Sequence, residues 1–184
     1  WEVSDLGPAK KYLGWHIRRD RERRKMWLTI DKKIRETVKN FGLEGCKPTK
    51  TPLPSGFNTH LPHGTDPTGP ERQPDKDSDH VYSPLLKKSD HNRYRSLVGS
   101  LQYFANCLRP DVPHAANSLA QIAHSPRERH WKPTVHYLKH LSRTPDLAIH
   151  YAREKEGQTL LGYSESDFPG CKGARKSTTG WMFT

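Results

Sequence analysis

The sequence predicts an α+β fold in which helices dominate, and three observations lead to this class. Apolar residues alternate at period two in residues 12–17 and 26–30, which is typical of β-strands. Apolar residues recur at helical spacing in residues 30–41 and in three segments between residues 90 and 151. A proline-rich stretch without apolar periodicity, residues 46–89, separates the two regions. The expected architecture is therefore a hairpin with a helix, a linker, and a three-helix block.

The N-terminal unit, residues 1–45, is predicted to be a β-hairpin followed by a helix. The charged segment Arg18–Lys25, which reads RRDRERRK, is expected to be the solvated loop of the hairpin. Thr29 is a suitable N-cap for the helix, and Gly42 can end it in the left-handed conformation. The apolar face expected in the core consists of Ile34, Val38 and Phe41.

The next stretch, residues 46–89, is predicted to be a disordered linker. Its prolines remove backbone donors, and its few apolar residues cannot offset the entropy lost on ordering. A proline-rich ligand for a partner domain is the alternative interpretation.

Three helices are predicted in residues 90–151. Asp90 is a suitable cap for the first, Arg109-Pro110-Asp111 breaks the chain before the second, and Ser125-Pro126 opens the third. Pro133 is expected to kink the third helix or delay its regular start. The apolar stripe of the first helix consists of Leu97, Val98, Leu101, Phe104 and Leu108.

The composition predicts a soluble intracellular protein with a modest core. Only 32% of the 184 residues are hydrophobic, so separate small clusters are expected rather than one continuous core. The first residues are not expected to be a signal peptide, and the sequence has no apolar run of membrane-spanning length. Cys46, Cys107 and Cys171 are isolated, which indicates a reducing compartment, the cytoplasm or the nucleus. No membrane partner is expected.

The charge is strongly positive and unevenly distributed. The formal net charge is +11, and residues 10–50 hold 14 Lys and Arg against 5 Asp and Glu. Such a stripe attracts polyanions by releasing their counterions. The alternative is that the charges only keep the tip of a hairpin in water.

Three motif blocks carry a family resemblance. They are YRSLVGSLQYFANCLRPD at Tyr94–Asp111, GYSESDF at Gly162–Phe168 and RKSTTGW at Arg175–Trp181. Shorter blocks occur in the matching order, including Asp5-Leu6-Gly7, Cys46-Lys47-Pro48, His130-Trp131 and Thr144. In that order the blocks resemble Ty1/copia-type retrotransposon polyproteins, where reverse transcriptase runs into ribonuclease H.

The resemblance implies a role for each part of the chain. Residues 1–45 resemble the end of the reverse transcriptase palm and thumb, and residues 90–151 resemble a thumb or connection block. Residues 157–184 resemble the truncated start of ribonuclease H, with two strands of an incomplete sheet. The parent activity would be RNA-directed DNA synthesis and degradation of the RNA–DNA hybrid. Because the chain begins without Met, we expect a polyprotein fragment; the alternative is a non-catalytic nucleic-acid-binding remnant of a decayed transposable element.

The resemblance also bears on catalysis. The family's polymerase uses an Asp-Asp pair, which this sequence lacks, and Mg²⁺ is the metal of the parent family. Glu165 stands where the ribonuclease H block has its first Asp, and Asp167 follows two residues later. These two residues are the catalytic candidates; the alternative is that they are polar positions of a surface strand. Two carboxylates cannot hold two Mg²⁺ ions, so we expect no cofactor and no activity for this chain alone.

The expected partners are the remainder of the polyprotein and nucleic acid, bound weakly through the backbone of a duplex or RNA–DNA hybrid. His136 and His140 have a spacing that is also found in zinc sites, but a third ligand is not evident. The candidate phosphate contacts are Arg18, Arg19, Arg21, Arg23, Arg24 and Lys25 near the start, and Lys172, Arg175 and Lys176 near the end.

Overall fold

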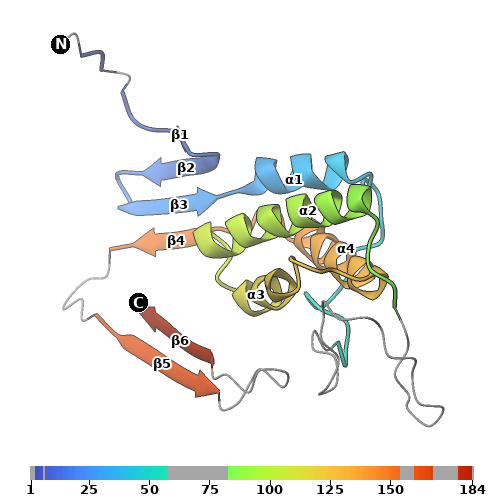
Figure 1. Cartoon of the computed structure of the whole chain (residues 1–184). Helices are drawn as coiled ribbons and strands as arrows, with labels where there is room; N and C mark the ends of the chain where they lie inside the picture. Colours follow the sequence, from blue (N-terminus) through green and yellow to red (C-terminus); the bar gives the residue numbers. More distant parts are fainter. Residues whose placement is uncertain (1–2, 6, 58–82, 154–159, 168–177, 184) are drawn as a thin grey trace. The chain divides into compact units, whose positions relative to one another are not determined.

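The computed structural model describes residues 3–5, 7–57, 83–153, 160–167 and 178–183. Within them lie four helices and two small antiparallel sheets, so the predicted α+β class is confirmed (Figure 1). The chain divides into two compact units. The first comprises Trp1–Phe57 with Ser83–Arg153, and the second comprises Asn58–Tyr82 with Glu154–Thr184.

The first unit contains a four-stranded antiparallel sheet. Its strands are β1 (Lys11–Tyr12), β2 (Trp15–Asp20), β3 (Lys25–Thr29) and β4 (Ile149–Ala152), in the order β1-β2-β3-β4. The last strand was not predicted from the sequence. It comes from the far end of the helical block and pairs with β3, so that the orange and blue strands lie side by side in Figure 1.

Four helices complete this unit: α1 (Asp31–Asn40), α2 (Lys88–Cys107), α3 (Pro113–Gln121) and α4 (Glu128–Arg143). Their buried residues form one hydrophobic cluster, which joins Ile30 and Ile34 to the apolar faces of α2, α3 and α4. For the first unit, the expectation of separate small clusters is therefore wrong. The β3–β4 pairing brings the ends of the helical block to the N-terminal sheet, so both regions bury their apolar faces together.

The apolar stripe predicted for α2 is buried in full, and the core also contains two tyrosines that were not predicted. The Tyr94 hydroxyl donates to the Leu119 carbonyl at 3.0 Å, and the Tyr137 hydroxyl donates to the Val112 carbonyl at 3.3 Å. Each polar tip thus has a partner, which allows an aromatic ring to lie inside the core.

The predicted helix caps are wrong by a few residues. α1 has Ile30 at its N-cap, and the Thr29 hydroxyl donates instead to the Asp31 carboxylate at 3.1 Å. α2 begins earlier, with Lys87 at its N-cap, so Asp90 lies in its first turn. α4 has Arg127 rather than Ser125 at its N-cap, and it includes Pro133 in its span.

Both ends of the stretch predicted as a linker pack against the first unit. Leu53, Phe57 and Leu86 contact the hydrophobic core. The ordered unit therefore extends into residues 46–57 and 83–89, further than the composition predicts. The middle of the predicted linker, residues 58–82, lies outside the described residues.

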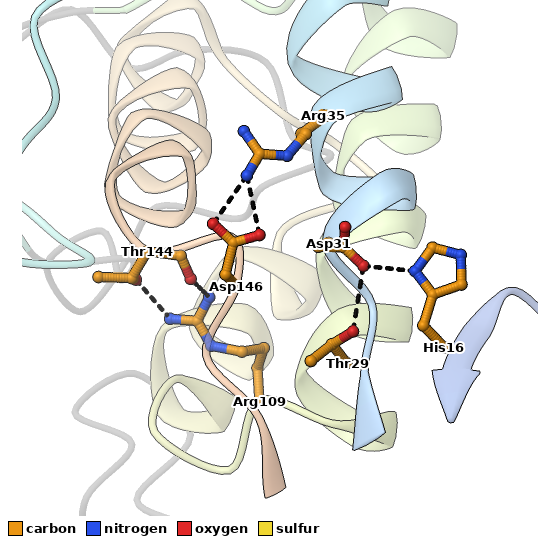
Figure 2. Close-up of polar contacts among 7 residues, drawn as sticks. All are labelled: His16, Thr29, Asp31, Arg35, Arg109, Thr144 and Asp146. Atoms are coloured by element: carbon orange, nitrogen blue, oxygen red, sulfur yellow. Dashed lines mark hydrogen bonds and ion pairs between the residues drawn. The ribbon is translucent and has the colours of Figure 1, made fainter. Parts of the chain in front are cut away.

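Three polar contacts tie the sheet and the helices together (Figure 2). The buried Arg109 donates to the carbonyl oxygen of Thr144 at 3.0 Å, at the end of α4. The Arg35 Nη2 of α1 lies 2.8 and 2.7 Å from the two carboxylate oxygens of Asp146, in the loop before β4. The His16 Nδ1 of β2 lies 2.6 Å from the Asp31 Oδ1 of α1.

The second unit contains a two-stranded antiparallel sheet formed by β5 (Gly162–Asp167) and β6 (Thr178–Phe183). Both strands occur where the motif blocks predicted them. Several large apolar side chains of this unit are exposed, and Trp181 shows 74% of its surface to solvent. A two-stranded sheet is marginally stable by itself.

Candidate nucleic-acid interface

The charged segment forms the end of the β2–β3 hairpin. The strands continue further than the sequence predicted, and only residues 21–24 form the loop. The Asp20 Oδ1 accepts the Arg23 backbone N–H at 2.9 Å, and Arg24 has a positive φ of 51°. The aspartate contact and the left-handed residue close a short turn, so the candidate cations lie close together at one end of the sheet.

The six predicted residues do not share one face. Arg18 lies opposite Trp27 across the β2–β3 pair, whereas Arg19 lies opposite Met26 on the other face. Arg21, Arg23 and Arg24 belong to the exposed loop. The hairpin therefore presents positive charge around its tip rather than along one side.

The two faces of the sheet differ in character. Trp15, Leu28 and Ile149 pack against the hydrophobic core. Because side chains alternate along a strand, Trp27 and His150 belong to the opposite face, where they lie directly across from one another. Their rings are stacked, with centroids 5.0 Å apart and planes 18° from parallel. The Arg18 Cζ lies 5.3 Å from the centre of the Trp27 ring.

One further cation joins the hairpin tip and was not predicted. The Arg153 backbone N–H donates to the Arg24 carbonyl at 3.2 Å, which brings the exposed Arg153 beside the loop. With residues 18–25, this gives seven basic residues against two acidic ones, a local net charge of +5. The alternation of apolar residues at 26, 28 and 30 would have been enough to predict that Trp27 lies on the outer face of the sheet. The places of His150 and Arg153 depend on the β3–β4 pairing, which has no local signal in the sequence.

The catalytic candidates lie in the second unit. Glu165 and Asp167 are two residues apart in β5, opposite Gly180 and Thr178 of β6, and the Glu165 side chain is exposed. The described residues contain no group of three or more His, Cys, Asp or Glu side chains that could hold a metal ion. Glu165 and Asp167 stay predicted candidates. Lys172, Arg175 and Lys176 lie outside the described residues.

The histidine pair of α4 has a structural explanation. The His136 Nε2 donates to the Thr51 carbonyl at 2.9 Å, and the His140 Nδ1 lies 3.3 Å from the Thr49 carbonyl. The Thr49 hydroxyl in turn donates to the His136 carbonyl at 3.0 Å. These contacts fix residues 49–51 along α4, and burial lowers the pKa of His140. The pair therefore holds residues 49–51 against α4.

Comparison with known proteins finds relatives that are named as transposon proteins. It is 32% identical over 184 residues to a retrovirus-related Pol polyprotein from the transposon TNT 1-94 of Nicotiana tabacum, covering all of this chain and 13% of that polyprotein. It is 40% identical over 98 residues to the Pol polyprotein from transposon RE2 of Arabidopsis thaliana, covering 52% of this chain and 6% of the relative. It is 26% identical over 181 residues to an uncharacterized mitochondrial protein of Arabidopsis thaliana, of which it spans 65%.

No protein-family model matches the chain, and no solved structure matches it significantly. The sequence relatives define the class: this chain is a homologue of the retrovirus-related Pol polyproteins of transposons. Within that class the predicted resemblance to Ty1/copia-type retrotransposon polyproteins is confirmed. The chain spans about an eighth of the tobacco polyprotein. In the described part of the chain, no helix combines the length and the apolar character needed to cross a membrane.

Proposed function

We propose that this chain is a segment of a Ty1/copia-type Pol polyprotein that spans the end of reverse transcriptase and the start of ribonuclease H. Its own contribution is sequence-independent contact with the backbone of an RNA–DNA hybrid or duplex. The observation that carries the proposal is the cluster of Arg and Lys at the β2–β3 hairpin, joined there by Arg153. Flexible, exposed cations of this kind bind phosphates and carry no sequence information.

The rest of the first unit supports the hairpin as a rigid element. The core holds one face of the sheet, and the contact between His16 and Asp31 joins β2 to α1. The Tyr103 hydroxyl also donates to the Leu13 carbonyl, which ties the turn before β2 to α2. The cations therefore project from a fixed base rather than from a mobile peptide, which reduces the entropy lost on binding.

Phosphodiester chemistry is not part of this proposal. The sequence has no Asp-Asp pair for a polymerase, and Glu165 and Asp167 supply only two carboxylates. Glu165 also places its oxygens one carbon–carbon bond further from the strand than an aspartate would, and a metal cluster tolerates little displacement. Both polymerase and nuclease activity would then require residues that other parts of a polyprotein supply.

Binding and cleavage are tested with one labelled substrate. A fluorescent RNA–DNA hybrid of about 20 base pairs should bind with micromolar or weaker affinity, and the affinity should fall steeply as salt rises. Affinity that is independent of salt would contradict the backbone contact. The same hybrid with Mg²⁺ or Mn²⁺ should remain intact; RNA cleavage that Glu165→Ala abolishes would show that the chain has a nuclease centre.

A non-catalytic nucleic-acid-binding remnant is the second candidate. It is favoured by Glu165 at the position where the family block has Asp, and by the short mitochondrial relative, of which this chain spans 65%. Sequencing the flanking reading frame separates the two candidates. An Asp-Asp hairpin upstream and further acidic residues downstream would support the polyprotein segment, whereas stop codons on both sides would support the remnant.

A further inference from the structure

The outer face of the four-stranded sheet carries a continuous row of stacked groups. Arg18, Trp27 and His150 lie directly opposite one another on β2, β3 and β4. The guanidinium of Arg18 lies over the Trp27 ring at 5.3 Å, and the His150 ring stacks on Trp27 at 5.0 Å. Because β2 and β4 flank β3 on opposite sides, Trp27 is the middle group of the row. The row thus begins with a cation and ends with an aromatic ring.

Among the described residues of the first unit, β4 is an edge strand of the sheet and the His150 side chain is exposed. One face of its ring is turned to Trp27, so the other face points away from the sheet's centre. A further flat ring placed there would continue the stack without displacing any contact of the row.

Two cations lie next to the His150 end of the row, on β3 and after β4. Lys25 lies opposite Ala152, which follows His150 by two residues on β4, and the exposed Arg153 comes next. Asp20 lies opposite Lys25, and its Oδ1 accepts the Arg23 backbone N–H at 2.9 Å. A flat ring bound at His150 would therefore have two cations beside it. A partner that combines flat rings with negative charge at regular spacing fits this surface, and a nucleic acid is such a partner.

We propose that this row is a stacking site for an unpaired base of single-stranded nucleic acid. The base stacks on His150, and Lys25 and Arg153 contact the adjacent phosphates. A duplex keeps its bases stacked inside, so the site favours single strands or strand ends. This proposal rests on the proposed function, because cations at the hairpin contact phosphates in the stacking site as they do in backbone binding. The stacking site adds recognition of unpaired bases.

The test compares two fluorescein-labelled DNA strands of about 12 nucleotides, oligo-dT and an abasic strand of the same length. Both carry the same phosphates, so a difference in affinity measures the bases alone. The full chain should bind oligo-dT on the order of five- to hundredfold more tightly than the abasic strand in fluorescence anisotropy. His150→Ala should remove most of that preference, and His150→Phe should keep it because the ring is retained. His124→Ala, an exposed histidine after α3, is the matched control and should leave the preference unchanged.

Each contrary result has a distinct meaning. Equal affinity for the two strands would overturn the stacking site while leaving backbone contact intact, and so would a base preference that survives His150→Ala. Absence of binding to both strands would overturn the stacking site, and absence of binding to the RNA–DNA hybrid as well would overturn the proposed function. Displacement of oligo-dT by polyglutamate as efficiently as by unlabelled oligo-dT would show that the surface binds acidic chains in general.

Discussion

Arg109 donates from Nη1 to the backbone carbonyl of Thr144 and from Nη2 to its hydroxyl, at 3.0 and 3.2 Å. Thr144 is the C-cap residue of α4, so a buried guanidinium lies at the negative end of that helix. The same guanidinium forms a bidentate ion pair with Asp111: Nε donates to Oδ1 at 2.8 Å, and Nη2 donates to Oδ2 at 2.7 Å. Two motif blocks that are more than thirty residues apart are thereby joined by one side chain.

Replacing Arg109 by Lys should destabilise the first unit. A lysine keeps the charge, but it cannot bind Asp111 with two parallel bonds and also reach Thr144. We expect the free energy of unfolding in urea to fall by about 2–4 kcal/mol. Arg95→Lys, on the exposed side of α2, is the control and should change it by less than about 0.5 kcal/mol. Equal stability of the two variants would show that the Arg109 contacts contribute little.

His130 should make stability depend on pH. Burial, followed by the charges of Arg129 and Arg127, lowers the pKa of His130 to about 4. Between pH 6.5 and 4 the unfolded chain then binds a proton that the folded chain does not. The free energy of unfolding should therefore fall as the pH drops through this window, by up to about 3 kcal/mol in total.

The matched variant for this pH dependence is His130→Gln. Glutamine retains an acceptor for the Arg127 backbone N–H, which the His130 Nδ1 accepts at 3.0 Å, but it does not titrate. Urea unfolding at about pH 7 and pH 5 should show a smaller pH effect for this variant than for the unchanged chain. If the variant keeps the same pH dependence of the free energy of unfolding, groups other than His130 cause that dependence. His114→Gln, an exposed position on α3, is the control.

The β3–β4 pairing is tested by two substitutions in one strand. Ile149→Asp places a charge on the side of β4 that packs against the core, so it should detach the strand and cost about 2–4 kcal/mol. His150→Asp changes the outer face and should be tolerated. Hydrogen exchange should show faster exchange at the β3 amides that pair with β4 in the first variant alone. The same exchange rates in both variants would contradict the assigned register.

Proteolysis can test the contacts between the α4 histidines and residues 49–51. His136→Ala removes the donor to the Thr51 carbonyl, which should free residues 49–51 from the helix. Trypsin should then cleave after the exposed Lys50 several-fold faster than in the unchanged chain, because local opening exposes the bond. An unchanged cleavage rate would mean that the core contacts of Leu53 and Phe57 hold this segment by themselves.

The sequence predicted what depends on local periodicity and missed what depends on long-range pairing. The stripe of α2 and the alternation in β2 and β3 were visible because each element has one buried face. β4 is only four residues long and becomes a strand by pairing with β3, so no local pattern marked it. Without β4, the joining of the two regions into one core could not be predicted either.

In the candidate site, too, the sequence predicted what depends on local pattern and missed what depends on long-range pairing. The charge run identified the hairpin cations, but strand register decides that Arg18 and Arg19 lie on opposite faces. The Trp27–His150 stack required the β3–β4 pairing. The histidines of α4 had a metal-like spacing, and the structure shows that their partners are backbone carbonyls of a distant segment. In each case the residue type indicated a polar or aromatic contact, but only the folded structure shows which residue is the contact partner.

The most direct test of the account is the salt dependence of nucleic-acid binding by a hairpin variant. The hairpin variant carries Gln in place of Arg21, Arg23 and Arg24. The control variant loses the same amount of charge, because Gln replaces three exposed lysines on three helices: Lys32, Lys88 and Lys132. Affinity for the RNA–DNA hybrid is measured between about 50 and 200 mM salt, and the slope of log affinity against log salt is compared. We expect the slope of the hairpin variant to be less steep by about 2–3, whereas the control keeps its slope. Equal slopes in both variants would contradict the central claim that the hairpin is where this chain contacts the backbone.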